Sequence, residues 1–402
     1  MTSAVQTLAA PLGLLAELTH RCPLGCPYCS NPLTLDGPGS EMDTATWRRV
    51  FREASNLGIV HVHLSGGEPA ARRDLAEIVA AVRAAGMYSN LITSGVGLTG
   101  SRLERLAAAG LDHVQISIQD SSPESADHFA GFAGAWQRKR ALAVEVAKLN
   151  LPLTINIVVH RRNIEHLSAM IEMALACGAT RVEIAHVQYY GWALRNRAAL
   201  MPLADQVEAA AAEIERLKAE YHGRIVIDAV TPDYFARYPK PCMGGWGRRS
   251  LNITPSGKVL PCHAAETIPG LTFWTVQEHP LADIWRNSPA FTAFRGEAWM
   301  QEPCRGCARR EIDFGGCRCQ AFLITGDARA TDPVCHLSPH RPLVDRARSE
   351  AATDSYTYRR MRRTPRNQND EAESLAPAPG IDDVTGLAHG FGHGHPRLPS
   401  ND

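Results

Sequence analysis

Three features are missing from this sequence, and each absence excludes a class of protein. No apolar run approaches the roughly 18 residues that a membrane-spanning helix needs. The N-terminal stretch carries no basic segment of the kind that opens a secretory signal. Lysine plus arginine and aspartate plus glutamate both number 42, so the net charge is zero and favours no polyanionic partner. We therefore predict a soluble, cytoplasmic protein that binds neither membrane nor nucleic acid.

The first half of the chain alternates between two apolar periods. With 402 residues, of which 45% are apolar, the chain is long enough to bury a large core. Strand-like runs alternate with helical apolar spacing and lie at residues 14–18, 59–64, 88–92, 114–118, 153–159 and 182–187. Such alternation predicts a parallel sheet with right-handed crossovers and functional loops at the carboxyl ends of the strands. We predict an α/β fold in which residues 1–231 form a partial (β/α)6 TIM-like barrel.

From about residue 232 the composition changes. Helical periodicity weakens, and seven of the eleven cysteines lie between Cys242 and Cys335. In a reducing compartment, spaced cysteines indicate metal ligation sooner than disulfides. We predict that residues 232–343 form a small cysteine-rich domain stabilised by bound metal.

The C-terminal segment has almost no aliphatic pattern. It is rich in Arg, Asp, Pro and Gly, which predicts a disordered tail at residues 344–402. His389, His393 and His395 lie among glycines there. We interpret these histidines as part of a solvated low-complexity end rather than as a metal site.

Three cysteines follow the first predicted strand in one short loop. Cys22, Cys26 and Cys29 are separated by three and then two residues. A tetrahedral zinc site needs a fourth ligand, for which His20 is a candidate. Three thiolates can instead hold three irons of a [4Fe–4S] cluster and leave the fourth iron open. The loop therefore predicts either a zinc site or an open-iron cluster.

A second motif at the end of the second strand favours the cluster. Ser65 is followed by Gly66, Gly67, Glu68 and Pro69, where the glycines permit close backbone approach and Glu68 can face an ammonium group. With the three-cysteine loop, this turn resembles the radical S-adenosylmethionine (SAM) superfamily. The resemblance implies that the open iron binds the methionine group of SAM and that the turn binds its amino group.

The same resemblance implies further SAM contacts. Tyr28 stands at the position where the superfamily places an aromatic residue near the adenine. Thr93 after the third strand and Ser117 on the fourth match the positions of ribose and carboxylate contacts. Ordinary packing or strand-end hydrogen bonds would account for these residues equally well. No catalytic acid or base can be identified from the sequence.

The later cysteines resemble the SPASM extension of radical SAM enzymes that modify peptides. That extension binds two auxiliary iron–sulfur clusters. Carried over by position, one set of ligands is Cys242, Cys262, Cys317 and Cys319, and the other is Cys304, Cys307, Asp313 and Cys335. Asp313 stands where the wider pattern has cysteine, and a carboxylate oxygen can also ligate iron. A structural zinc site is the alternative for these cysteines.

The chain resembles the PqqE group of pyrroloquinoline quinone (PQQ) biosynthesis in four features. Two are Asp313 in place of cysteine and the added Cys319. The other two are the runs Leu-Ala-Glu-Leu-Thr-His-Arg-Cys at residues 15–22 and Cys-Pro-Tyr-Cys-Ser-Asn-Pro at residues 26–32. This resemblance implies a 5′-deoxyadenosyl radical that cross-links a glutamate and a tyrosine side chain of the precursor peptide PqqA. It also implies the peptide chaperone PqqD and an electron donor such as a flavodoxin as partners.

Other functions compatible with the motifs are a thioether-forming or sulfatase-maturing SPASM enzyme and a non-catalytic iron–sulfur electron-transfer protein. The electron-transfer alternative leaves the Gly66–Pro69 turn unexplained.

Overall fold

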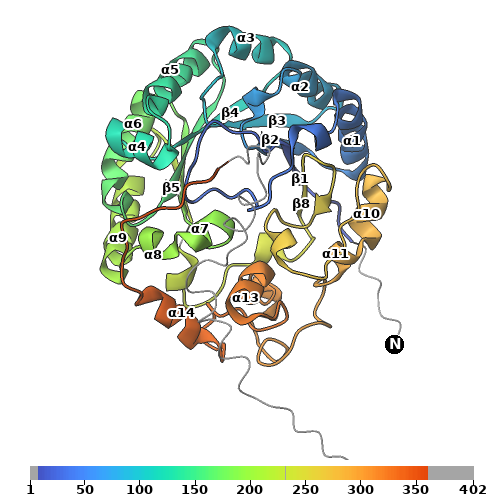
Figure 1. The fold of residues 1–402 in the computed structure, drawn as a ribbon, viewed down its shortest axis with the longest axis vertical. Coiled ribbons are helices and arrows are strands. Elements are labelled where there is room, and N and C mark those ends of the chain that lie inside the picture. The colour runs from blue at the N-terminus through green and yellow to red at the C-terminus, as the bar shows by residue number, and fades with distance from the viewer. Residues whose placement is uncertain (1–7, 231, 361–402) are drawn as a thin grey trace, which may run out of the picture.

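The computed structural model describes residues 8–230 and 232–360 of the chain. Within these ranges one nine-stranded sheet runs through the molecule, in the order β7-β6-β5-β4-β3-β2-β1-β8-β9 (Figure 1). Its strands are β1 (Gly13–Thr19), β2 (His61–Gly66), β3 (Tyr88–Thr93), β4 (His113–Ile118), β5 (Leu153–Val159), β6 (Arg181–His186), β7 (Val226–Val230), β8 (Ser250–Ile253) and β9 (Val259–Leu260). Neighbouring strands from β7 to β8 are parallel, and only β9 is antiparallel to its partner. The predicted α/β barrel fold is confirmed.

Helices cover the outer face of the curved sheet. Figure 1 shows α1, α2, α3, α5, α6 and α9 around its rim, with the cysteine-rich region closing the open side. The helices are α1 (Thr44–Leu57), α2 (Leu75–Ala84), α3 (Gly100–Ala108), α4 (Pro123–Ala130), α5 (Ala135–Lys148), α6 (Leu167–Ala176), α7 (Gly191–Arg195), α8 (Arg197–Leu200), α9 (Ala204–Glu220), α10 (Leu281–Asn287), α11 (Pro289–Thr292), α12 (Arg310–Asp313), α13 (Arg318–Thr325) and α14 (Arg341–Arg348). No helix in the described ranges has the length and apolarity that crossing a membrane requires.

Helix α1 illustrates how local sequence builds these units. The side chain of Asp43 accepts a hydrogen bond from the Thr46 amide at the N-terminus of the helix. Gly58, in the left-handed conformation, ends it. Between these ends Trp47 and Phe51, one helical turn apart, are fully buried against the sheet.

The sheet is longer than the sequence predicts. Strand β7 was not predicted, because an edge strand with one neighbour shows little apolar alternation, and its two terminal valines, Val226 and Val230, are exposed. Strand β8 was assigned to a separate domain, yet it pairs with β1 and places Leu251 and Ile253 in the barrel core. The domain limits 1–231 and 232–343 stay a prediction, but the two regions share one sheet and one core.

The prediction of disorder from residue 344 is wrong for its first part. Helix α14 extends to Arg348, where Val344 is fully buried. Beyond it, Thr357 and Arg359 form hydrogen bonds with residues of the barrel. An extended segment without an apolar period can still be ordered when its main chain finds hydrogen-bond partners on another part of the fold. The rest of the predicted tail, residues 361–402 with the three histidines, lies outside the described residues.

Because β8 belongs to the barrel core, we expect Leu251→Ala to destabilise the whole described fold by about 2–5 kcal/mol, as for other large-to-small core substitutions. The matched control is Leu12→Ala, since Leu12 is 58% exposed and Leu251 is 1% exposed. Anaerobic chemical denaturation should show one cooperative transition shifted in the Leu251 variant alone. Two separate transitions would contradict a shared core.

Candidate functional site

The three-cysteine loop lies at the carboxyl end of β1. The Cys29 amide donates to the Cys26 carbonyl over 3.2 Å, and the Gly25 amide is anchored to the Ala130 carbonyl over 2.8 Å. The three thiols lie close enough to influence one another, since Cys26 raises the pKa of Cys22 and Cys29 raises that of Cys26. The structure therefore brings together the three residues predicted as ligands of the first cluster.

Burial dominates the titration of these thiols. It raises the pKa of Cys22 to about 12 and that of Cys26 to about 11. The charge of Lys139 opposes the rise at Cys26, and the charge of Arg359 opposes it at all three cysteines. Thiols with such pKa values are protonated at neutral pH, so metal binding must displace their protons.

The glycine turn after β2 packs directly on the main chain of the cysteine loop. The register of β1 and β2 shifts after Glu17, which brings Thr19 opposite Gly66. A Cβ atom on Gly66 would lie 2.3 Å from the Thr19 carbonyl oxygen, at a φ of +123°. A Cβ atom on Gly67 would lie 2.4 Å from the Arg21 carbonyl oxygen. Side chains at either position would therefore separate the two loops.

Glu68 is buried at this junction and held by four hydrogen bonds. Its Oε1 accepts from the Ala70 amide at 2.9 Å and from the Thr93 hydroxyl at 2.8 Å. Its Oε2 accepts from the Ser94 amide at 2.7 Å and from the Ser94 hydroxyl. Burial raises the pKa of Glu68, and these hydrogen bonds oppose the rise. Thr93, predicted as a SAM contact, thus orients the carboxylate in this structure.

A cavity of about 500 Å³ joins the cysteine loop to Glu68. It is lined by Arg21, Cys22, Pro23, Glu68, Ala70, Ala71, Val96, Gly97, Phe132 and Arg138. A carboxylate, two guanidinium groups and an apolar wall suit a zwitterionic amino acid with an apolar chain. The cavity therefore fits the methionine part of SAM beside a cluster held by the loop.

The other two predicted SAM contacts, Tyr28 and Ser117, are not among the residues that line this cavity. The Tyr28 ring lies 5.7 Å from the His160 ring, and burial raises the pKa of Tyr28 well above its usual value. Ser117 is half-buried on β4, and its carbonyl accepts from the Lys139 ammonium group at 2.8 Å. Both residues border the same end of the sheet, and their roles as SAM contacts stay predictions.

Lys139 is a functional candidate that sequence reasoning missed. It is fully buried on α5 and also donates to the Gln119 side chain at 2.6 Å. Burial lowers its pKa to about 8, and the nearby acidic groups of Cys26, Cys22 and Glu68 oppose that fall. The signal was available, because Lys139 stands at helical spacing from Ala135, Leu142 and Val146 on the buried face of α5.

The first auxiliary set comes together from three elements. Cys242 lies in the 3₁₀ turn Cys242–Gly244, Cys262 follows β9, and Cys317 and Cys319 lie at the N-terminus of α13. All four side chains belong to one packed cluster. Cys242 and Cys319 lower the pKa of Cys317 well below its usual value, and Cys319 lowers that of Cys262 to about 7. The four cysteines predicted as one ligand set are therefore neighbours.

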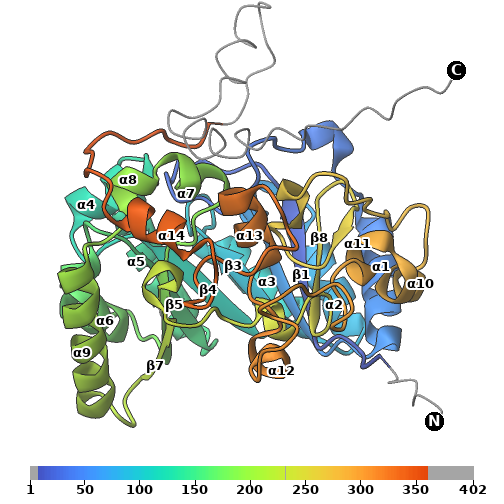
Figure 2. The same ribbon diagram turned by 90° about the horizontal axis from the view of Figure 1, so that it is seen from below.

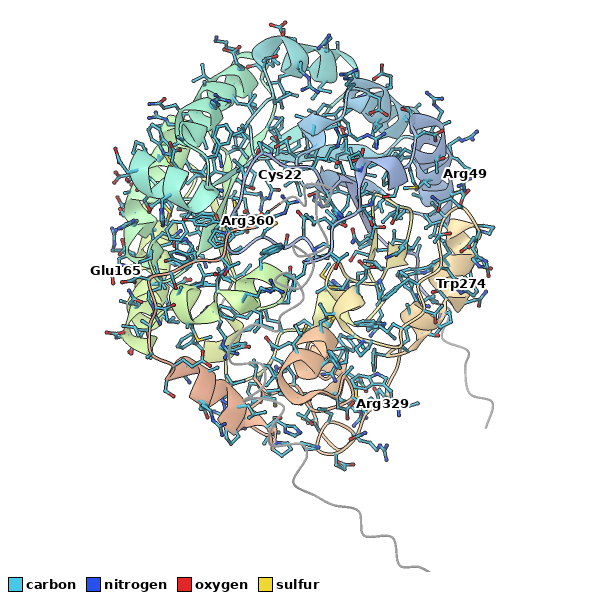
Figure 3. The ribbon with its side chains drawn as sticks, viewed as in Figure 1. Cys22, Arg49, Glu165, Trp274, Arg329 and Arg360 are labelled. Carbon is cyan, nitrogen blue, oxygen red and sulfur yellow. The ribbon has the colours of Figure 1, made fainter. Side chains whose placement is uncertain are left out.

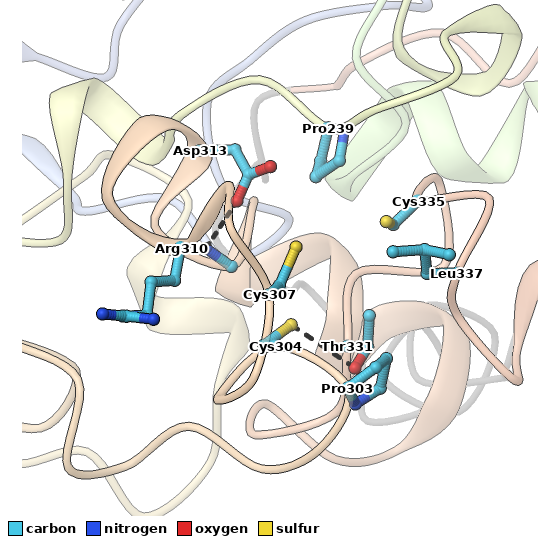
Figure 4. Close-up of a pocket in the computed structure, with 10 residues that line it drawn as sticks. Pro239, Pro303, Cys304, Cys307, Arg310, Asp313, Thr331, Cys335 and Leu337 are labelled. Atoms are coloured by element: carbon cyan, nitrogen blue, oxygen red, sulfur yellow. Dashed lines mark hydrogen bonds between the residues drawn. The ribbon is translucent and has the colours of Figure 1, made fainter.

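The second auxiliary set lines a separate pocket (Figure 4). Cys304, Cys307, Cys335 and the Asp313 carboxylate face the same space there. Asp313 is 7% exposed, and its carboxylate accepts from Arg309 Nε at 3.3 Å and from the Gly315 amide at 3.1 Å. A carboxylate held in this position can complete a ligand set with three thiolates.

No three His, Cys, Asp or Glu side chains in the described part of the chain are arranged to hold a single metal ion. An iron–sulfur cluster makes a different demand, because each ligating side chain binds a separate iron, so the ligands stand further apart than those of one metal ion.

Tyr190 lies between the first cysteine loop and the first auxiliary set. Its hydroxyl pairs with His263 Nε2. Burial raises the pKa of Tyr190 well above its usual value, and the negative charges of Cys262 and Cys29 add to the rise. Its position near both groups of cysteines depends on which distant segments meet in the fold, and its place in the chain shortly after β6 does not predict it.

Two family models match the chain. One, described as the radical SAM superfamily, matches residues 16–174. The other, described as an iron–sulfur cluster-binding domain, matches residues 242–308. The matched ranges contain the first cysteine loop with Glu68 and the first part of the auxiliary ligand sets.

Curated relatives match most of the chain. A PqqA peptide cyclase of Methylocella silvestris is 63% identical over 87% of this chain and 95% of its own length. The PqqA peptide cyclase of Granulibacter bethesdensis is 54% identical over 90% of this chain and 97% of its own.

Solved structures share the fold at low identity. Streptococcus suis SuiB bound to SAM has a TM-score of 0.69 at 18% identity, covering 82% of this chain and 78% of its own. The SAM-bound protein anSMEcpe has a TM-score of 0.59 at 16% identity, covering 84% and 95%.

Substitution of Gly67 tests the contact between the two loops. We expect Gly67→Ala to destabilise the protein by about 1–3 kcal/mol, as overpacking does elsewhere, because the added methyl group meets main-chain atoms. Gly37→Ala is the control, since nothing lies within 4 Å of a Cβ atom there. Thermal denaturation of both variants measures the difference, and equal stability would contradict the close contact.

Substitution of Asp313 tests the second auxiliary set. We expect Asp313→Ala to lower the iron content and alter one auxiliary spectrum, while the first cluster stays intact, because only one ligand set loses a donor. Glu311→Ala is the matched control, since the Glu311 side chain is 74% exposed two residues away. Iron analysis and EPR spectra that match those of the control would remove Asp313 from the ligand set.

Proposed function

The chain belongs to the PqqA peptide cyclase family of radical SAM enzymes, and from this we propose that it forms a carbon–carbon cross-link between a glutamate and a tyrosine side chain of the peptide PqqA in PQQ biosynthesis. The observation that carries the proposal is the cavity in which Cys22 of the three-cysteine loop and the buried Glu68 face one ligand. Homology identifies the substrate class, and the cavity supplies the site for the chemistry.

Each ligand set has a proposed group. Cys22, Cys26 and Cys29 would hold a [4Fe–4S] cluster, and Glu68 would bind the amino group of SAM. When bound, these groups supply a radical able to break an unactivated C–H bond, and the two auxiliary iron–sulfur clusters supply an acceptor for an electron. The first auxiliary cluster would lie on Cys242, Cys262, Cys317 and Cys319, and the second on Cys304, Cys307, Asp313 and Cys335.

The protein's own residues orient and enclose the reactants. Thr93 and Ser94 fix both oxygens of Glu68, so the carboxylate presents one geometry to a bound ammonium group. Buried Lys139 places a positive charge near the cysteine loop and Glu68, which favours an anionic group there. Tyr28 and Ser117 are proposed contacts of the SAM adenosine and carboxylate. Burial of these groups keeps water from a reactive radical.

The partners follow from the same family membership. The substrate is a peptide, as the name of the curated relatives indicates. We further propose that PqqD presents this peptide, that a flavodoxin-like protein donates electrons, and that the reaction takes place in the cytoplasm. The high identity to PqqA peptide cyclases disfavours a thioether-forming or sulfatase-maturing activity.

An anaerobic assay tests the function. Reconstituted protein, reductant, SAM, PqqA and PqqD should produce 5′-deoxyadenosine together with a peptide lighter by a pair of hydrogen atoms, because a new C–C bond replaces a C–H bond on each side chain. Liquid chromatography with mass spectrometry follows both products. Formation of 5′-deoxyadenosine with an unchanged peptide would contradict the substrate assignment.

The cysteine loop provides the matched variants for this assay. Replacing Cys22, Cys26 and Cys29 together by alanine should abolish SAM cleavage, because no thiolate would remain to bind the first cluster. Cys177→Ala is the control, since Cys177 is a buried free thiol at the end of α6. Retained cleavage in the triple variant would overturn the assignment of the loop.

A further inference from the structure

A C-terminal strap, residues 349–360, returns from α14 to the cysteine loop. Figure 1 shows it as the red segment that leaves α14 and runs into the centre of the ring, and Figure 2 shows it along the same edge as α7 and α8. In Figure 3 the labels of Arg360, at the strap's end, and Cys22 stand close together near the middle of the ring. The strap therefore ends beside the candidate site, although more than three hundred residues separate Arg359 from His20 in the chain.

The first part of the strap is attached to the barrel by charge and by aromatic packing. Glu350 pairs with Arg197, and Asp354 pairs with Arg162. The Tyr356 ring then lies 5.4 Å from the Phe129 ring, at the end of α4. Because surface ion pairs alone contribute little, the buried contacts further along must hold the strap in place.

Asn196 ties the strap to the cysteine loop with a single side chain. Its amide nitrogen donates to the Pro27 carbonyl and to the Thr357 carbonyl, each at 2.8 Å. Its amide oxygen accepts from the Thr357 amide at 2.7 Å. Asn196 is 4% exposed. A buried amide whose donors and acceptor are all used this way fixes the distance between the two segments.

Arg359 holds the same loop from a second point. Its main-chain amide donates to the Gly25 carbonyl at 2.9 Å, and its guanidinium group donates to the His20 carbonyl. The residue is 4% exposed. Both main-chain groups of Gly25 therefore form hydrogen bonds, since its carbonyl accepts from Arg359 and its amide donates to the Ala130 carbonyl of the barrel. A Cβ atom on Gly25 would lie only 3.1 Å from the Arg359 carbonyl oxygen, so the fit is close.

The loop needs such partners. It has proline and glycine between its cysteines and forms no helix or strand, so its carbonyl groups have no regular partners of their own. The strap satisfies the carbonyls of His20 and Gly25, and Asn196 satisfies that of Pro27. These three carbonyls are distributed along the segment that carries the cysteines.

We propose that the strap is a clamp that belongs to the first cluster site, with Arg359 and Asn196 as positioning residues that hold the cysteine loop in its cluster-binding conformation. This inference rests on the proposed function in one respect, the binding of a cluster by the loop.

The experiment compares Arg359→Ala with Arg360→Ala in the full chain. Arg360 carries the same charge at the next position but is exposed, so it is the matched control. With reconstituted protein, we measure how fast an added iron chelator removes the EPR signal that responds to SAM. We expect loss about 10–100-fold faster in Arg359→Ala, the range typical for residues that orient metal ligands. The auxiliary signals and the melting temperature should match those of the control.

Asn196→Asp provides a second variant of nearly the same shape. It keeps the acceptor for the Thr357 amide but loses the donors to Pro27 and Thr357, so it should also accelerate cluster loss. Both Arg359→Ala and Arg359→Lys keep the main-chain bond to Gly25, but only Arg359→Lys keeps a charged donor, and we expect it to restore part of the retention. Equal rates of cluster loss in Arg359→Ala, Asn196→Asp and the Arg360 control would overturn the clamp.

Hydrogen exchange in the metal-free protein separates this inference from the proposed function. The amides of residues 20–29 should exchange faster in Arg359→Ala than in Arg360→Ala, whatever the loop binds. If that difference is found but the wild type has no SAM-responsive cluster, the clamp stands as a loop-positioning device and the proposed function fails. If exchange is identical in both variants, the clamp fails and the function is unaffected.

Discussion

The candidate site depends on one main-chain contact, between the Gly66–Gly67 turn and the loop that follows β1. Parallel neighbours end at the same edge of a sheet, so the two loops meet wherever their strands pair. Only glycine permits the approach at Gly66 and Gly67, because a Cβ atom would meet carbonyl oxygens within 2.3–2.4 Å. The contact brings Glu68 beside Cys22 in one cavity. Two motifs that are separate in sequence thereby become one binding site.

Near this contact, and again beside the first auxiliary set, the protein buries acidic and basic groups that would be costly in isolation. Glu68 is stabilised by four hydrogen bonds, and Lys139 by the Ser117 carbonyl and the Gln119 side chain. Asp332, fully buried beside the first auxiliary set, accepts from the Cys317 and Val334 amides. Burial raises the pKa of Asp332 to about 7. Such groups are fixed in place because any movement would leave a charge unpaired in a medium of low dielectric constant.

The cysteine-rich region shares one sheet and one core with the barrel. Strand β8 continues the sheet from β1, the same strand whose carboxyl end carries the first cysteine loop. Trp285 and Phe291 of α10 and α11 join the core that contains Trp47 of α1. The auxiliary ligand sets therefore have a defined position relative to the first loop, and Tyr190 with His263 occupies the space between them.

The sequence by itself determined the alternation of strands and helices and the grouping of Cys22, Cys26 and Cys29, whereas the division of the later ligands into two sets came from the resemblance to the SPASM extension. The period of apolar residues and the spacing of nearby cysteines are local properties, so they can be recognised without knowledge of the fold. Only the tertiary structure decided that β8 pairs with β1, that Lys139 lies near the cysteines, and that Arg359 bonds the carbonyls of His20 and Gly25. Each of these depends on which distant segments meet. Every residue has the same main-chain hydrogen-bonding groups, so the sequence does not indicate which distant segments will bond to each other.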